Sequence, residues 1–174
     1  MLVNLPDELF AADFYLLNEH YKCCGEEGSF EDAQRQRQSD SIVNWLRDAR
    51  TLGGSVNLSA GTPFAVVGDL NMVGGLHPLH TLLTGDIQNN ATYGSDSPPD
   101  WDGTSIVDAR PSHNGAGSAF YTWREDGSGF PAEQLDFITY SDSALDVGNK
   151  FVLNTVGMTA GQRTATGLFQ FDTA

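Results

Sequence analysis

The chain has 174 residues, which is enough for a single domain, residues 1–174, with a sizeable hydrophobic core. It carries 23 acidic and 9 basic residues, and the net charge of −14 disfavours tight, unassisted binding to the phosphates of nucleic acids. No apolar run approaches the roughly 20 residues of a membrane-spanning helix, and residues 1–13 lack the basic and apolar regions of a signal peptide.

The first predicted element is a buried strand over residues 13–22, where a continuous apolar run gives way to alternation toward His20. Two adjacent cysteines follow, Cys23 and Cys24. Neighbouring Cα atoms lie about 3.8 Å apart, below the usual range for a disulfide, so a bridge between them would be strained. We therefore expect two reduced thiols here, and a pair without further cysteine ligands makes a poor zinc site.

A long helix is predicted next, over residues 33–50, because Ser29 and Asp32 resemble a capping box and helix-forming residues follow. Four apolar residues recur at helical spacing on one face: Ile42, Trp45, Leu46 and Ala49. The helix also carries four of the nine basic residues: Arg35, Arg37, Arg47 and Arg50. Charged residues on a helix usually face water, and we expect these four arginines to do so.

The remaining predicted elements are strands, one short helix and a long loop. A strand over 63–68 precedes a helix over 77–83, which has Pro78 in its first turn. Residues 85–118 are rich in Gly, Ser, Asp, Asn and Pro and are too long for an inert connection, which makes them a candidate functional loop. Three further strands are predicted, over residues 119–125, 133–141 and 150–156. Strands that alternate with helices early and pair later indicate a layered α/β sandwich.

The strand at 63–68 runs directly into Asp69 and Asn71, two polar residues at positions i and i+2. Their side chains can point the same way as the strand leaves the sheet, and Gly68 allows a tight exit. Asp69 can bind a divalent metal or accept a proton, while the amide of Asn71 can donate to a phosphoryl oxygen. An Asx-type turn explains the same two residues equally well, and the tetrapeptide leaves both interpretations open.

Four short motifs occur in order along the chain: HYKCCG (20–25), GDLN (68–71), YTWR (121–124) and QLDFITYSDS (134–143). Together they resemble the endonuclease/exonuclease/phosphatase superfamily, the metal-dependent phosphoesterases related to DNase I and the abasic-site endonucleases. The resemblance runs from about Asp13 to Ala174. It implies a DNase I-like four-layer α/β/β/α sandwich, incomplete in this chain, that hydrolyses phosphodiesters or phosphomonoesters with Mg²⁺ or Mn²⁺.

The resemblance also implies a role for each matching residue. Asp69 matches the aspartate that orients or deprotonates the attacking water, and it is the residue expected to contact the metal. Asn71 matches the asparagine that contacts the scissile phosphate. His20 is similar to a phosphate-contacting histidine that can serve as general acid. Asp136 matches the aspartate that holds a C-terminal histidine in its working tautomer.

These assignments have structural alternatives. Tyr121 and Trp123 occupy the positions of substrate-facing aromatic residues in the family, but they can equally pack in the core. His20 without the family pattern would be interpreted as a core histidine. Asp136 lies on an apolar strand, where burying an unpaired carboxylate is costly, so we expect it to have a partner. The other three histidines are expected at the surface: His77, His80 and His113.

The chain also departs from the family pattern at both ends. Family members open with a strand that ends in asparagine and with a metal-binding glutamate, and both precede the histidine strand by many residues. Here His20 lies only nineteen residues after Met1. Family members close on Ser-Asp-His, which does not occur after Asp136. These differences predict a chain truncated at both ends, a fragment with weak or no activity by itself.

Three hypotheses about function follow. The first is a hydrolase whose substrate is a nucleic acid, a nucleotide, or a lipid or inositol phosphate. The second is a catalytically inactive remnant of the same fold that binds phosphate or nucleotide. The third is an unrelated structural or interaction domain whose motif matches are accidental. Specificity would lie in residues 85–118, and the acidic composition does not exclude a secreted nuclease.

Overall fold

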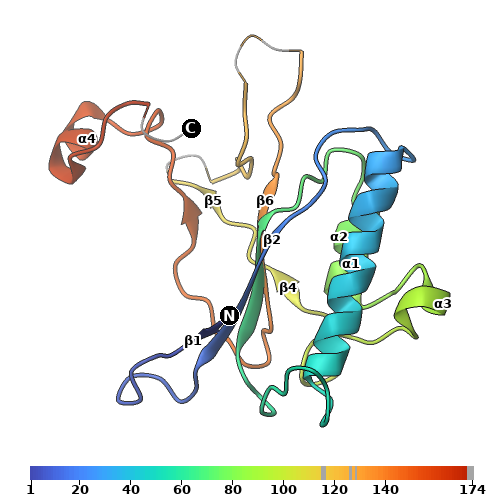
Figure 1. Ribbon diagram of the computed structural model, residues 1–174. Coiled ribbons are helices and arrows are strands. Elements are labelled where there is room, and N and C mark those ends of the chain that lie inside the picture. Colours follow the sequence, from blue (N-terminus) through green and yellow to red (C-terminus); the bar gives the residue numbers. More distant parts are fainter. Residues whose placement is uncertain (115–116, 126, 128, 172–174) are drawn as a thin grey trace.

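The computed structural model describes residues 1–114, 117–125, 127 and 129–171. Its central element is a five-stranded mixed sheet in the order β1–β2–β3–β6–β4 (Figure 1). The strands are β1 (Leu2–Val3), β2 (Phe14–His20), β3 (Phe64–Asp69), β6 (Asp136–Tyr140) and β4 (Val107–Asp108). β2 and β3 run parallel, and the other neighbouring strands are antiparallel. The chain is therefore a mixed α/β protein, which confirms the predicted class.

The helices are α1 (Phe30–Ala49), α2 (His77–Thr84), α3 (Asn90–Tyr93) and α4 (Ala160–Thr166). Of these, α1 and α2 lie against one face of the sheet, and the C-terminal segment lies on the other side of it (Figure 1). Two short parallel strands, β5 (Ser112–His113) and β7 (Phe151–Val152), form a second sheet. Within the described ranges, no helix has both the length and the apolar character that crossing a membrane requires.

The long helix α1 begins at Phe30, directly after the predicted cap Ser29 and three residues before the predicted range of 33–50. The hydroxyl of Ser29 accepts a hydrogen bond from the backbone N–H of Asp32 at 3.1 Å, which satisfies one of the free donors of the first turn. The carboxylate of Asp32 accepts in turn from the N–H of Gly28 at 2.9 Å, one residue before the position that a capping box uses. The helix start is therefore stabilised from both directions.

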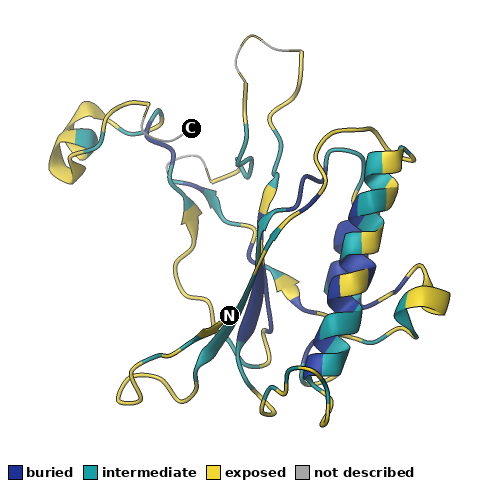
Figure 2. Ribbon diagram, viewed as in Figure 1, coloured by how far each residue is buried: buried dark blue, intermediate teal, exposed yellow. Residues whose placement is uncertain are grey.

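The main hydrophobic core lies between α1 and the sheet. Leu46 is fully buried in a cluster with Phe64, Val66 and Phe137, which point from β3 and β6 toward the helix. Figure 2 shows the buried residues of α1 on the side that faces the sheet. The predicted apolar face of the helix is confirmed, and Trp45 at its margin stacks on Tyr15 with ring centroids 5.6 Å apart.

The arginines of α1 do not form the solvated face that the sequence predicts. Arg37 is exposed, but Arg35 is completely buried, and Arg47 and Arg50 are half-buried. Arg47 donates to the backbone carbonyls of Tyr93 and Ser95, and Arg50 donates to those of Pro98 and Asp100. The expectation was wrong because loop carbonyls replace water as partners of the guanidinium groups, which carry several donors each.

Several expected strands are shorter than predicted. Among the described residues, 119–125 form only an isolated bridge between Trp123 and Glu133, so the strand predicted there was wrong. The strand predicted over 133–141 is reduced to β6, and that over 150–156 to β7. The predicted loop 85–118 contains α3, β4 and β5, and the helix α4 was not predicted. β-propensity favoured strands here, but few partner strands are available to pair with them.

Candidate functional site

Three of the predicted site residues form a row across neighbouring strands. His20 at the end of β2 is in register with Asp69 at the end of β3, and Asp69 is in register with Asp136 at the start of β6. Nε2 of His20 lies 3.6 Å from Oδ2 of Asp69. Residues directly opposite each other on neighbouring strands present their side chains on the same face. The sheet therefore brings together groups that are 116 positions apart in the sequence (136 − 20).

This row lies on the face of the sheet away from α1. Side chains alternate between the two faces of a strand, and Phe64 and Val66 of β3 point into the core under the helix. Asp69 therefore shares the opposite face with Ala65 and Val67, which belong to a smaller apolar cluster. The side chain of His20 is 74% exposed and that of Asp69 is 37% exposed, so both are open to solvent.

The close approach of β2 and β3 at the row depends on Gly68. Its φ is +134°, and a Cβ added there would lie 1.9 Å from the backbone oxygen of Glu19. No other residue fits between the two strands without displacing backbone. The glycine was predicted to allow a tight exit from the strand, and the close contact with β2 is a further reason for a glycine at this position.

Asp69 and Asn71 do form an Asx-type turn, in which Oδ1 of Asp69 accepts a hydrogen bond from the N–H of Asn71 at 3.0 Å. The turn and the functional interpretation are compatible, because the other carboxylate oxygen, Oδ2, faces His20. The turn holds the carboxylate in one orientation. The structural interpretation is therefore confirmed, and the functional interpretation stays a prediction.

Asn71 connects the ends of β2 and β3. It is buried, with a positive φ of 49°, a conformation that asparagine adopts more readily than most residues. Its side-chain nitrogen donates to the carbonyl of Tyr21 at 3.2 Å, which is the first residue after β2. The amide nitrogen has a second N–H, which is the one that could donate to a substrate oxygen.

Asp136 was expected to be buried and therefore to need a partner for its carboxylate. The structure shows that it is exposed. β6 alternates exposed and buried residues, and Asp136 is one of the exposed ones. Its backbone is instead held by Thr122, whose hydroxyl accepts from the N–H groups of Leu135 and Asp136 at 3.0 and 2.9 Å. Thr122 lies inside the YTWR motif, but its role in holding the start of β6 was not predicted.

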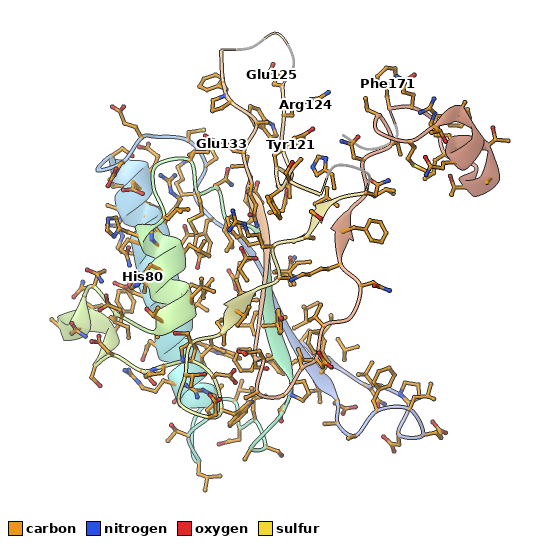
Figure 3. All side chains as sticks on the ribbon, turned by 180° about the vertical axis from the view of Figure 1, so that it is seen from behind. His80, Tyr121, Arg124, Glu125, Glu133 and Phe171 are labelled. Atoms are coloured by element: carbon orange, nitrogen blue, oxygen red, sulfur yellow. The ribbon has the colours of Figure 1, made fainter. Side chains whose placement is uncertain are left out.

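The two aromatic candidates lie on the segment that extends beyond the start of β6. Figure 3 shows Tyr121 there with Arg124, Glu125 and Glu133, whereas His80 lies on α2, away from this segment. The hydroxyl of Tyr121 accepts a hydrogen bond from Arg124 at 3.2 Å. Trp123 is half-buried and pairs through its backbone with Glu133. Neither residue is in the main core cluster under α1, which was the structural alternative.

The ring of Tyr121 packs against His113, which is the centre of a buried polar network. His113 was expected at the surface. His113 is only 3% exposed. Its Nε2 lies 2.6 Å from the carbonyl of Tyr121, and its Nδ1 lies 2.8 Å from the side-chain nitrogen of Asn154. A carbonyl can only accept, so Nε2 carries the proton and Nδ1 accepts from Asn154. The surface prediction was wrong because the asparagine and the carbonyl replace water as partners; His77 and His80 are exposed as expected.

The described residues do not complete a metal site. Within the parts of the chain that the structure describes, no group of three or more His, Cys, Asp or Glu side chains could hold an ion. The row supplies the carboxylates of Asp69 and Asp136. Mg²⁺ binds proteins through one or two carboxylates together with waters and substrate phosphates, so these two residues alone would leave most of its coordination to other groups.

A cavity between β2 and α1 does not coincide with the row. It has a volume of about 830 Å³ and lies between β2 and α1, where Tyr15, Leu17, Glu19 and Trp45 contribute to its lining. Burial raises the pKa of the Glu19 carboxyl above its ordinary value. His20, Asp69 and Asp136 are not part of its lining. These three side chains therefore lie outside the cavity, on a sheet face where His20 and Asp69 are open to solvent.

Comparison of the chain with models of protein families, with curated proteins and with solved structures finds no match of any of these three kinds.

Proposed function

We propose that this chain is a phosphoesterase domain of DNase I-like fold that hydrolyses phosphodiesters or phosphomonoesters in a nucleic acid, a nucleotide, or a lipid or inositol phosphate. The observation that supports the proposal is the 3.6 Å approach of His20 Nε2 and Asp69 Oδ2 at the ends of two parallel strands. A carboxylate and an imidazole that lie side by side can act on the same substrate, one as proton acceptor and the other as proton donor.

The roles follow from the position of each group. Asp69, oriented by the N–H of Asn71, accepts the proton of the attacking water. His20 contacts the phosphoryl group or protonates the leaving oxygen from the neighbouring strand. Asn71 donates its second amide N–H to a phosphoryl oxygen. Tyr121 and Trp123 contact the rest of the substrate from the segment that precedes β6.

Mg²⁺ or Mn²⁺ belongs to the proposal as a cofactor that offsets the charge developing on the phosphoryl oxygens. Asp69 would contact the ion, and Asp136, which is in register with Asp69, would be the second carboxylate. A net charge of −14 makes a cation useful for any anionic substrate that approaches this chain. Every step assigned above is carried by side chains of the protein.

The second candidate is a binding domain that holds phosphate or nucleotide without turnover. It is favoured by one observation: within the described residues, the metal-binding group is incomplete. This alternative uses His20 and Asn71 as phosphate contacts and assigns no proton transfer to Asp69.

Hydrolysis of an aryl phosphodiester, with and without Mg²⁺ or Mn²⁺, tests the proposal directly. We expect weak, metal-dependent turnover that falls by about 10²-fold or more in Asp69→Asn and His20→Gln, the range typical of lost general acid–base catalysis. Asp7→Asn and His80→Gln are matched controls, because both residues are exposed and outside the row, and they should retain full turnover.

Binding measurements separate the two candidates. Calorimetry with inorganic phosphate and with a nucleotide should show binding that His20→Gln weakens. Binding without turnover would support the second candidate over the first. Neither turnover nor binding, in protein whose circular dichroism shows a folded α/β domain, would refute both.

A further inference from the structure

Two exposed cysteines lie just after β2, three positions beyond His20. The Sγ atoms of Cys23 and Cys24 are 2.9 Å apart, and Cys24 donates a hydrogen bond to Cys23. Both are free thiols, as the sequence predicts. Their side chains therefore face each other as a vicinal dithiol that is open to solvent.

Hydrogen bonds from the side chain of Arg35 hold the backbone around this pair. This guanidinium is fully buried, and its Nη1 donates to the carbonyls of Lys22 and Cys24 at 3.0 and 2.6 Å. Its Nη2 donates to the carbonyl of Gly25 at 3.3 Å. Cys24 itself has a φ of 69°, a conformation that is uncommon for a residue other than glycine, asparagine or aspartate. The buried arginine thus holds both cysteines in the orientation in which their thiols meet.

The two thiols are not equivalent. The hydrogen bond that Cys24 donates to Cys23 raises the pKa of the Cys24 thiol, which therefore keeps its proton at neutral pH. The thiolate is the nucleophile in thiol–disulfide exchange. Because Cys24 holds its proton in the contact with Cys23, Cys23 is the residue that reacts first.

We propose that Cys23 and Cys24 form a reactive dithiol site that a low-molecular-weight disulfide oxidises to an intramolecular Cys23–Cys24 bond. In the first step the Cys23 thiolate attacks the external disulfide, forms a mixed disulfide and releases one external thiolate. In the second step Cys24, on losing its proton to water, attacks the Cys23 sulfur and releases the second external thiolate. The protein loses two electrons and two protons, and the external disulfide is reduced to two thiols.

The geometry makes this bond reversible. Adjacent Cα atoms lie about 3.8 Å apart, below the usual range for a disulfide, so the closed ring is strained. Strained disulfides are reduced more easily than relaxed ones. The reduced pair is therefore the stable state until an oxidant is present.

Intact-mass measurement tests the proposal on the folded full chain treated with excess glutathione disulfide. We expect a product that has lost two hydrogens, carries no glutathione, and returns to the starting mass with a mild reductant. Cys23→Ser and Cys24→Ser cannot close the ring, and a glutathione adduct on the remaining cysteine is expected in each. Wild-type protein that accumulates stable glutathione adducts or a disulfide-linked dimer would overturn the proposal.

A second measurement isolates the contribution of the fold. In urea the contacts of Arg35 are lost, so we expect closure of the ring from the mixed disulfide to slow by about tenfold or more, as proximity arguments imply. Equal closure rates in folded and unfolded protein would show that sequence adjacency alone brings the thiols together. Phenylarsine oxide provides an independent probe, since one equivalent should block both thiols in wild type and dissociate readily from either serine variant.

Discussion

The helix-covered half of the sheet and the C-terminal segment are stabilised by different interactions. Under α1, Leu46 and Phe64 belong to a cluster of apolar side chains. Around β5 and β7 the buried residues include His113, Asn154 and Thr155, which are polar. A hydrophobic cluster loses stability in proportion to the volume removed, whereas a buried hydrogen-bond network leaves an unpaired group when one partner is deleted. The first arrangement is visible in hydrophobic periodicity, and the second is not.

The largest effect is expected from Leu46→Ala, which removes a fully buried side chain from the apolar cluster. Substitutions of this kind cost about 2–5 kcal/mol of the free energy of unfolding. Urea denaturation should show a cooperative loss for the whole domain, while Leu52→Ala, at a residue that is 95% exposed, should change stability by less than about 0.5 kcal/mol. A loss below about 1 kcal/mol in Leu46→Ala would contradict the assignment of the core.

A loss of about 3 kcal/mol is expected from Arg35→Met, because carbonyls of the 22–25 loop lose a charged donor inside the protein. Arg37→Met is the matched control, since that arginine is exposed. Thermal unfolding of both variants compares the loss of a buried arginine with the loss of an exposed arginine on the same helix. Similar stability of the two variants would mean that Arg35 does not hold the loop.

Asn154→Ala should reduce the stability of this region by about 1–3 kcal/mol. The substitution removes the group that donates a hydrogen bond to His113 and the oxygen that accepts one from the N–H of Gly157, so the effect should be local. Hydrogen exchange should speed up at β5 and β7 and stay unchanged in α1. Asn149→Ala, at an exposed position, should leave both regions as in wild type. Faster exchange in α1 as well would show that the two regions unfold as one unit.

The smallest effect is expected from Glu19→Gln, beside the cavity between β2 and α1. Burial raises the pKa of this carboxyl above 4.5, so the folded state binds the proton more tightly than the unfolded state. Stability from this group is therefore complete below pH 4.5 and decreases as the pH rises through the folded-state pKa. Glu19→Gln should raise the melting temperature slightly at neutral pH and leave it unchanged at pH 4. The exposed control Glu8→Gln should leave the melting temperature unchanged at both pH values.

The elements that the sequence predicts well are those with a strong period. β2, α1, β3 and α2 follow from apolar spacing and from the cap at Ser29. The residues His20, Asp69 and Asp136 were chosen from three separate motifs, and the strand register brings them into one row. The family resemblance that suggested them remains a prediction.

The residues that the sequence misplaces are polar groups whose partners are distant or are backbone atoms. His113 is buried because of Asn154, 41 positions later, and Arg35 is buried because of loop carbonyls that carry no side-chain identity. Thr122 binds two backbone N–H groups, which is equally invisible in a sequence pattern. The helix α4 begins with a capping box formed by Thr159 and Gln162. This motif is present in the sequence, although hydrophobic periodicity does not reveal it.

The alternation of side chains along β2 and β3 has a consequence for directed evolution. Positions such as Leu17 and Val66 face α1, while His20 and Asp69 face the other way, so fold and chemistry are encoded at interleaved positions of the same strands. A library that randomises only the outward positions could therefore explore new reactivity on an unchanged scaffold. The exception is Gly68, where any side chain would meet the backbone of β2, and such a library should keep that codon fixed.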